Sequence, residues 1–112
     1  MVWVCMRIIA RKTLRDYVTS LEGHADQKAV KSALDAWFAE VSRAEWRTSA
    51  DVRQLYATAS IVTAERIVFN ICGNDHRLVA AVNFRKGIVW IKWVGSHADY
   101  DNIDVRTVQH GS

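Results

Sequence analysis

Residues 66–94 read RIVFNICGNDHRLVAAVNFRKGIVWIKWV, and this stretch decides the fold. Apolar and polar side chains alternate through three segments that are rich in Val, Ile, Phe and Trp, which predicts three strands. The segments are 66–72, 75–84 and 88–94. Gly73-Asn74 separates the first pair and Lys86-Gly87, or a slightly longer turn, separates the second. Two-residue linkers of this kind favour hairpins. The stretch therefore predicts three consecutive antiparallel strands.

Two-residue turns at both linkers fix a register. The predicted cross-strand pairs are Cys72–Asp75, Asn70–Arg77, Arg85–Ile88 and Lys92–Ala81. One face is then the core face, with His76 as its only polar member beside Ile67, Phe69, Ile71, Leu78, Ala80, Val82, Phe84, Val89, Ile91 and Trp93. The opposite face carries Arg66, Asn70, Arg77, Asn83, Arg85 and Lys92 among Val68, Val79, Ala81, Ile88, Trp90 and Val94. A slip of one residue would mix the two sets.

The first half of the chain predicts helices that cover the core face. Apolar residues recur at helical spacing from Lys12, at Leu14, Tyr17, Val18 and Leu21, and Gly23 ends that helix. A longer helix over 26–45 has the stripe Val30, Leu34, Trp37, Phe38 and Val41. A short strand over 7–10 precedes them, and a short helix capped by Thr48 or Ser49 runs to Tyr56. The expected fold class is α+β, with two N-terminal helices packed on one face of an antiparallel sheet and a short C-terminal helix.

Length and composition suit one soluble domain. The chain has 112 residues, of which half are hydrophobic, and no apolar stretch has the length of a membrane span. We interpret residues 1–5 as an extension and 105–112 as a flexible tail of a single domain over 1–112. Cys5 and Cys72 are the two cysteines, which argues against a structural zinc site and fits a reducing cytoplasm. We expect no metal and no cofactor.

The face opposite the core face is a candidate surface for single-stranded RNA. Cationic side chains contact phosphates, and tryptophan rings stack on bases. The net charge of +3 is compatible with such a partner, and four cations without an acid (Arg7, Arg11, Lys12 and Arg15) open the chain. The alternative is a half-solvated sheet on which long charged side chains cover apolar area.

The segment 94–101, VGSHADYD, carries the candidate chemistry. Gly95 permits a turn and Ser96 can cap a short helix, so His97 lies at the sheet end where Arg77 also lies. Histidine titrates near neutral pH and can move a proton between the ribose 2′-hydroxyl and the leaving oxygen. Arg77 and Lys92 can stabilise the charged phosphorane, and Tyr100 follows within one helical turn. The alternatives are that His97 only hydrogen-bonds a helix N-terminus and that Tyr100 only covers the core edge.

Several of these runs resemble the HigB toxins of the RelE superfamily. The resemblance rests on IVFNI at 67–71, on Gly73-Asn74, on RLV at 77–79 and on VGSHADYD at 94–101, in that order. RIIA at 7–10, Lys12, Leu14 and the tryptophan-bearing second helix also fit, so the resemblance covers about residues 6–104. Ser96 stands where these toxins usually have threonine, which keeps the hydroxyl group.

The resemblance implies a RelE-like fold and a type II toxin that cleaves mRNA without a metal, in the ribosomal A site during translation. It implies a HigA-type helix-turn-helix antitoxin as partner, with operator DNA bound only through the complex. Together with the register, it gives Arg77, Lys92, His97 and Tyr100 as expected catalytic residues. Lys12, Arg66, Asn70, Asn74 and Arg85 are expected to bind RNA. A non-catalytic RNA- or ribosome-binding module and a simple protein-interaction domain remain alternatives.

Overall fold

The computed structural model describes residues 5–73 and 75–109. The helices in this part are α1 (Arg11–Ser20), α2 (Gln27–Arg43), α3 (Ser49–Leu55) and α4 (His97–Tyr100). The strands are β1 (Arg7–Ile9), β2 (Ser60–Ile61), β3 (Arg66–Ile71), β4 (His76–Asn83) and β5 (Ile88–Ser96). Most predicted helix and strand ends are within two residues of these bounds, and the short strand β2 was not predicted. The α+β class is confirmed.

The strands form one sheet in the order β1-β5-β4-β3-β2. The pairs among β2, β3, β4 and β5 are antiparallel, whereas β1 pairs with β5 in parallel. The prediction of a wholly antiparallel sheet is therefore wrong at β1. A parallel pair needs a long crossover, and the helices and three intervening strands supply it.

The hairpin between β3 and β4 has the predicted register. Asn70 pairs with Arg77 and Ile71 with His76, and the Asp75 amide donates to the Cys72 carbonyl oxygen across the turn. Cys72 and Gly73 both have positive φ angles, of 52° and 66°. Such angles suit the tight turns that join twisted strands. The predicted register is thus confirmed, although four residues (72–75) separate the paired Ile71 and His76.

The hairpin between β4 and β5 differs from the prediction in register. Ile88 pairs with Asn83 instead of Arg85, and Ala81 pairs with Trp90 instead of Lys92. The cause lies in the turn, where the Asn83 side-chain oxygen accepts a hydrogen bond from the Lys86 amide at 2.9 Å. Asparagine initiates turns in this way, so the loop has four residues (84–87) and the register moves by two. A two-residue shift preserves the faces near this turn.

A β-bulge at Lys92 changes the face of the residues that follow it. Ala80 pairs with Ile91 and Val79 with Trp93, which leaves Lys92 as the extra residue. Val94, predicted on the outer face, is therefore buried in the core, and Trp93, predicted in the core, contacts Tyr100 on the outer face. Both predictions were wrong because strict alternation does not reveal a bulge.

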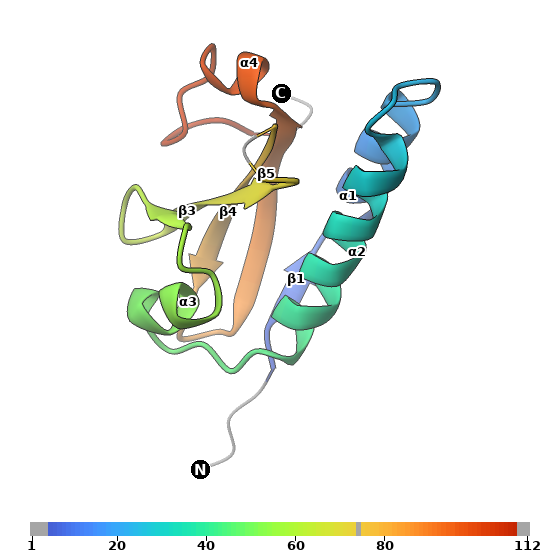
Figure 1. Ribbon diagram of the computed structural model, residues 1–112. Coiled ribbons are helices and arrows are strands. Elements are labelled where there is room, and N and C mark those ends of the chain that lie inside the picture. Colours follow the sequence, from blue (N-terminus) through green and yellow to red (C-terminus); the bar gives the residue numbers. More distant parts are fainter. Residues whose placement is uncertain (1–4, 74, 110–112) are drawn as a thin grey trace.

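The core lies between the sheet and the two long helices. Leu14 of α1, the four buried residues of α2 (Val30, Leu34, Trp37 and Val41) and the inward side chains of β3, β4 and β5 form one cluster. The Trp37 ring meets the Phe69 ring edge-on, with centroids 5.4 Å apart. The ribbon shows α1 and α2 side by side along one side of the sheet, with α4 and the C-terminal segment on the other (Figure 1).

The outer face of the sheet is less open than predicted. Val68 and Val79 are buried, although they do not belong to the core cluster. Arg66 donates hydrogen bonds to the carbonyl oxygens of Val105 and Val108, so the segment after α4 lies against this face. Met6 is buried in the core. Cys5, the last residue of the predicted extension at 1–5, is exposed, whereas residues 1–4 of that extension and 110–112 of the predicted tail lie outside the described residues. None of the helices described combines the length and apolarity of a membrane span.

Candidate functional site

The short helix α4 presents His97 at one end of the sheet. Ser96 caps this helix, because its hydroxyl oxygen accepts a hydrogen bond from the Asp99 amide at 3.2 Å. The His97 amide donates to the Asp75 carbonyl oxygen at 2.9 Å and so ties α4 to the turn between β3 and β4. The predicted cap is confirmed. The His97 side chain at the start of this helix is 49% exposed.

Arg77 lies beside His97 because of the register of three strands. Asn70 of β3 and Gly95 of β5 are its partners on either side, so Arg77 is on the central strand, one row from the end of the sheet. Its Nη2 atom is 3.1 Å from Nδ1 of His97. A guanidinium group can only donate hydrogen bonds, so Nδ1 accepts and the neutral imidazole carries its proton on Nε2. The Arg77 and His97 side chains are therefore held next to each other, and the lone pair on Nδ1 of His97 accepts the hydrogen bond from Arg77.

Tyr100 and Trp93 fix the other side of Arg77. The guanidinium carbon is 5.0 Å from the centre of the Tyr100 ring, which is a cation–π contact. The Trp93 ring is next to Tyr100, with centroids 6.2 Å apart. A Cβ atom at Gly95 would overlap the Trp93 ring, so glycine is needed there for space. The sequence interpretation of Gly95 as a turn residue was wrong on this point.

Acidic groups also approach the site. The Nε2 atom of His97 is 4.0 Å from an Asp101 carboxylate oxygen, one helical turn further along the chain. Because Nε2 carries the proton in the neutral ring, Asp101 faces the donor side of the imidazole. No group of three His, Cys, Asp or Glu side chains in residues 5–73 and 75–109 is arranged to hold a metal.

The structure brings three of the four predicted catalytic residues together. Arg77 contacts both His97 and Tyr100, whereas no hydrogen bond or ring contact joins Lys92 to them among the residues described. Lys92 is half-exposed at the bulge, on the strand that leads to the site. The sequence analysis did not predict the contacts that Trp93, Asp101 and the Asp75 carbonyl oxygen make at the site. Trp93 could have been predicted only from knowledge of the bulge.

The predicted RNA-binding residues are spread more widely. Asn70 is next to Arg77, but Arg85 follows the other end of β4, about 20 Å away at the usual strand rise. Arg66 is engaged by two carbonyl groups of the C-terminal segment. Lys12 is on α1, where it pairs with Asp16. Asn74 lies outside the described residues.

A second histidine, His76, lies at the same sheet end on the core face. It is 3% exposed, its Nδ1 atom is 2.7 Å from the Tyr17 hydroxyl, and its Nε2 atom is 3.3 Å from an Asp26 carboxylate oxygen. Nε2 donates to the carboxylate and the phenol donates to Nδ1. Burial and the nearby Asp99 and Asp26 carboxylates raise the pKa of Tyr17 to about 12. The prediction that His76 lies on the core face is confirmed, and its two side-chain contacts connect α1 and the N-cap residue of α2 to the sheet.

A family model describes most of this architecture. The model of the HigB toxins, the RelE-like toxic component of a toxin-antitoxin system, matches residues 30–103. The chain belongs to this family. The match includes Arg77, His97 and Tyr100, and it begins inside α2, so that α1 lies outside it. No curated protein matches the chain.

Membership gives the chain a biological role and a partner. It is a RelE-like toxin of a toxin-antitoxin system, and such a toxin implies an antitoxin that neutralises it. The resemblance stated from the sequence is confirmed at this level, and the mixed sheet with its helices is consistent with a RelE-like fold.

Proposed function

We propose that Arg77, His97 and Tyr100 form the active site of a metal-independent endoribonuclease that cleaves mRNA. The observation that carries the proposal is the 3.1 Å contact between Arg77 Nη2 and His97 Nδ1, on an exposed sheet end. It pairs a permanent cation with a group that can gain or lose a proton near neutral pH. Cleavage of RNA requires both functions at one phosphate.

The nucleophile of this reaction is part of the substrate. The ribose 2′-oxygen attacks the adjacent phosphorus, the bond from phosphorus to the 5′-oxygen breaks, and a 2′,3′-cyclic phosphate remains. One proton leaves the 2′-hydroxyl and one reaches the departing 5′-oxygen. The protein therefore has to supply proton transfer and stabilise negative charge on the phosphorane, which together account for several orders of magnitude in rate.

Arg77 and His97 divide these tasks. A phosphate group competes with Nδ1 of His97 for the Arg77 guanidinium, because charge-assisted bonds to phosphate are the stronger ones. When Arg77 turns to the phosphate, the lone pair on Nδ1 becomes available to accept the proton of the 2′-hydroxyl. The His97 imidazolium formed in this way then gives a proton to the departing 5′-oxygen, which returns the ring to its neutral form. In this proposal, substrate binding frees Nδ1 of His97 to act as the base. In the absence of RNA, the Arg77 guanidinium occupies the lone pair on Nδ1.

Tyr100 and Lys92 have supporting roles in this proposal. The Tyr100 ring lies against the guanidinium and limits the directions in which Arg77 can turn. Lys92 adds a cation on the strand beside the site. Asn70 is the best-placed RNA contact because it is next to Arg77, and Arg85 would reach a nucleotide further along the strand. Lys12 and Arg66 are less well placed than Asn70 to contact RNA. Lys12 pairs with Asp16 on α1, and Arg66 is bonded to carbonyl oxygens of the C-terminal segment.

The biological setting completes the proposal. We place the cleavage on mRNA that is being translated on the ribosome, in the cytoplasm. We also propose a type II system with a HigA-type antitoxin, whose complex with the toxin binds operator DNA. These steps rest on the family and on the resemblance of the site motifs.

The test is a comparison of the wild type with Arg77→Ala and Arg77→Lys under a tightly controlled promoter, with the 5′ ends of cellular mRNA mapped. We expect cuts within translated frames for the wild type, a loss of about 100-fold or more for Arg77→Ala, and partial activity for Arg77→Lys. Growth arrest without cuts would overturn the proposal and favour a non-catalytic module that blocks translation.

A further inference from the structure

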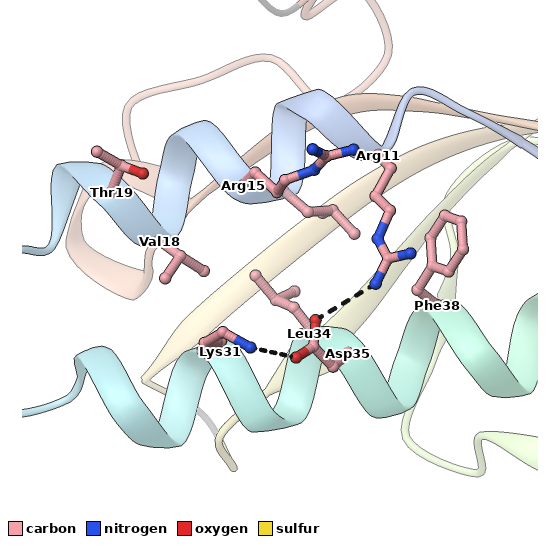
Figure 2. A pocket seen from close by; sticks show the side chains of 9 residues that line it. Arg11, Arg15, Val18, Thr19, Lys31, Leu34, Asp35 and Phe38 are labelled. Atoms are coloured by element: carbon pink, nitrogen blue, oxygen red, sulfur yellow. Dashed lines mark hydrogen bonds and ion pairs between the residues drawn. The ribbon is translucent and has the colours of Figure 1, made fainter.

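The helical side of the molecule has a groove that the proposed active site does not use. It has a volume of about 480 Å³ and runs between α1 and α2. The apolar lining consists of Val18 and Phe38, which are partly exposed, above the buried core residues Leu14 and Leu34. The polar and charged side chains Arg11, Arg15, Thr19, Lys31 and Asp35 line the rim (Figure 2). Helices α1 and α2 run along one side of the sheet, whereas α4, which begins at His97, lies on the other side (Figure 1).

Charge at the rim is predominantly positive. Arg11 approaches Asp35 at 4.0 Å while its guanidinium carbon is 4.6 Å from the Phe38 ring centre, and Lys31 pairs with the same Asp35 at 2.7 Å. One carboxylate is thus shared by two cations. Arg15 has no hydrogen bond or ion pair in the part of the chain that the structure describes. The groove presents two positive charges in excess over an apolar base.

We infer that this groove binds an acidic amphipathic helix of the antitoxin. The apolar residues are spaced by four on both helices, at 14 and 18 and at 34 and 38, which forms the furrow that a third helix fills. Acidic residues on the flanks of that helix would meet Arg15, Arg11 and Lys31. The inference rests on the toxin-antitoxin family and is independent of the nuclease chemistry.

Two other occupants fit the observations less well. Nucleic acid would have to place phosphates beside Asp35 and over four apolar side chains, although polyanions are bound by polar, positively charged surfaces. A second copy of the chain, with its net charge of +3, would bring cations against cations. An acidic helix with an apolar stripe satisfies both the charge and the hydrophobic surface.

The experiment uses the full-length toxin and, as probe, its antitoxin, identified as the protein whose co-expression restores growth. The test variant is the double charge reversal Arg15→Glu/Lys31→Glu. The matched control is Lys28→Glu/Arg53→Glu, which changes the net charge equally at exposed positions outside the groove. Thermal unfolding of each protein verifies that it is folded.

We expect the groove variant to bind the probe at least about tenfold more weakly and to escape neutralisation, while it still arrests growth when expressed alone. The control should stay within about threefold of the wild type. Overlapping peptides from the probe should be tested for competition with the whole probe for the toxin. We expect the peptide that competes to come from an acidic amphipathic segment. Unchanged binding by the groove variant, or a competitor without acidic residues, would overturn the inference.

A second measurement does not depend on variants. Hydroxyl-radical footprinting of the wild-type complex should show protection of Phe38, which is half-exposed in the free chain. Exposed Phe38 in the complex would contradict the inference. Loss of growth arrest by the groove variant alone would identify the groove as part of the toxic activity and also overturn it. Absence of RNA cuts in every protein would contradict the proposed nuclease without affecting the binding result.

Discussion

His76 and His97 lie almost side by side at one end of the sheet, since His76 pairs with Ser96 and His97 follows it. Their surroundings are opposite. His76 is buried, with one ring nitrogen bonded to a phenol and the other facing a carboxylate. His97 is half-exposed, and its Nδ1 atom is engaged by a guanidinium that a phosphate can draw away. A buried histidine with a partner on each ring nitrogen holds the fold together, and an exposed histidine whose partner is exchangeable is available for chemistry.

The largest expected effect separates the two histidines by activity. His97→Ala should lower mRNA cleavage by about 10²–10³-fold, because it removes the group that moves the proton. The free energy of unfolding should change by no more than about 0.5 kcal/mol, as is usual for exposed positions. Cleavage rates in a purified translation reaction and chemical denaturation measure the two quantities. Retained cleavage would remove His97 from the mechanism.

His76→Ala should have the reverse effect. The substitution leaves the Tyr17 hydroxyl without the ring nitrogen that it contacts and creates a cavity under α1. The free energy of unfolding should therefore fall by about 2–4 kcal/mol. Cleavage per folded molecule, measured well below the unfolding temperature, should stay within a few-fold of the wild type. A loss of activity in folded protein would mean that the two histidines act together.

Gly95→Ala tests the packing that holds the exposed site. The added methyl group overlaps the Trp93 ring, which should cost about 1–3 kcal/mol of stability and disturb Arg77, the cross-strand neighbour of Gly95. Trp93→Leu in the same chain should restore part of the stability, because it removes the overlapping ring. If the single variant is as stable as the wild type, the close approach of Trp93 to residue 95 is not present in solution.

The smallest effect concerns the pH dependence around His76. The phenol of Tyr17 has a pKa raised to about 12, above its ordinary value of 10, so the folded state favours the protonated form. This contribution to stability is complete below pH 10 and is lost as the pH rises from about 10 to 12. Tyr17→Phe should therefore show a smaller fall in unfolding free energy over that range. Identical pH profiles for both proteins would contradict the burial of the phenol.

The sequence predicted the helix-covered face far better than the face that carries the site. Alternation and the Gly73-Asn74 turn gave the pairing of Asn70 with Arg77, and helical spacing gave the buried residues of α2. The predictions that failed depended on side chains with local effects: Asn83 lengthened a turn, and the extra residue Lys92 reversed Trp93 and Val94. A turn-forming amide leaves the alternation of apolar residues unchanged. The bulge shifts the alternation by one residue, but Trp93 and Val94 are both apolar and so do not reveal it.

The candidate site shows the same limit. The sequence placed Arg77 and His97 at one end of the sheet, but their hydrogen bond depends on the cap at Ser96 and on the contact from the His97 amide to Asp75. The coverage of the outer face by the C-terminal segment through Arg66 follows from tertiary contacts between residues about 40 positions apart. Local patterns carry no information about such contacts.

The most direct test of the central claim is the chemistry of the RNA ends made by the purified toxin on translating ribosomes. If Arg77 and His97 catalyse attack by the 2′-hydroxyl, the wild type will leave 2′,3′-cyclic phosphate and 5′-hydroxyl ends, and His97→Ala will leave almost none. RNA fragments with 5′-phosphate ends, or equal cleavage by the His97→Ala protein, would contradict this account of the site.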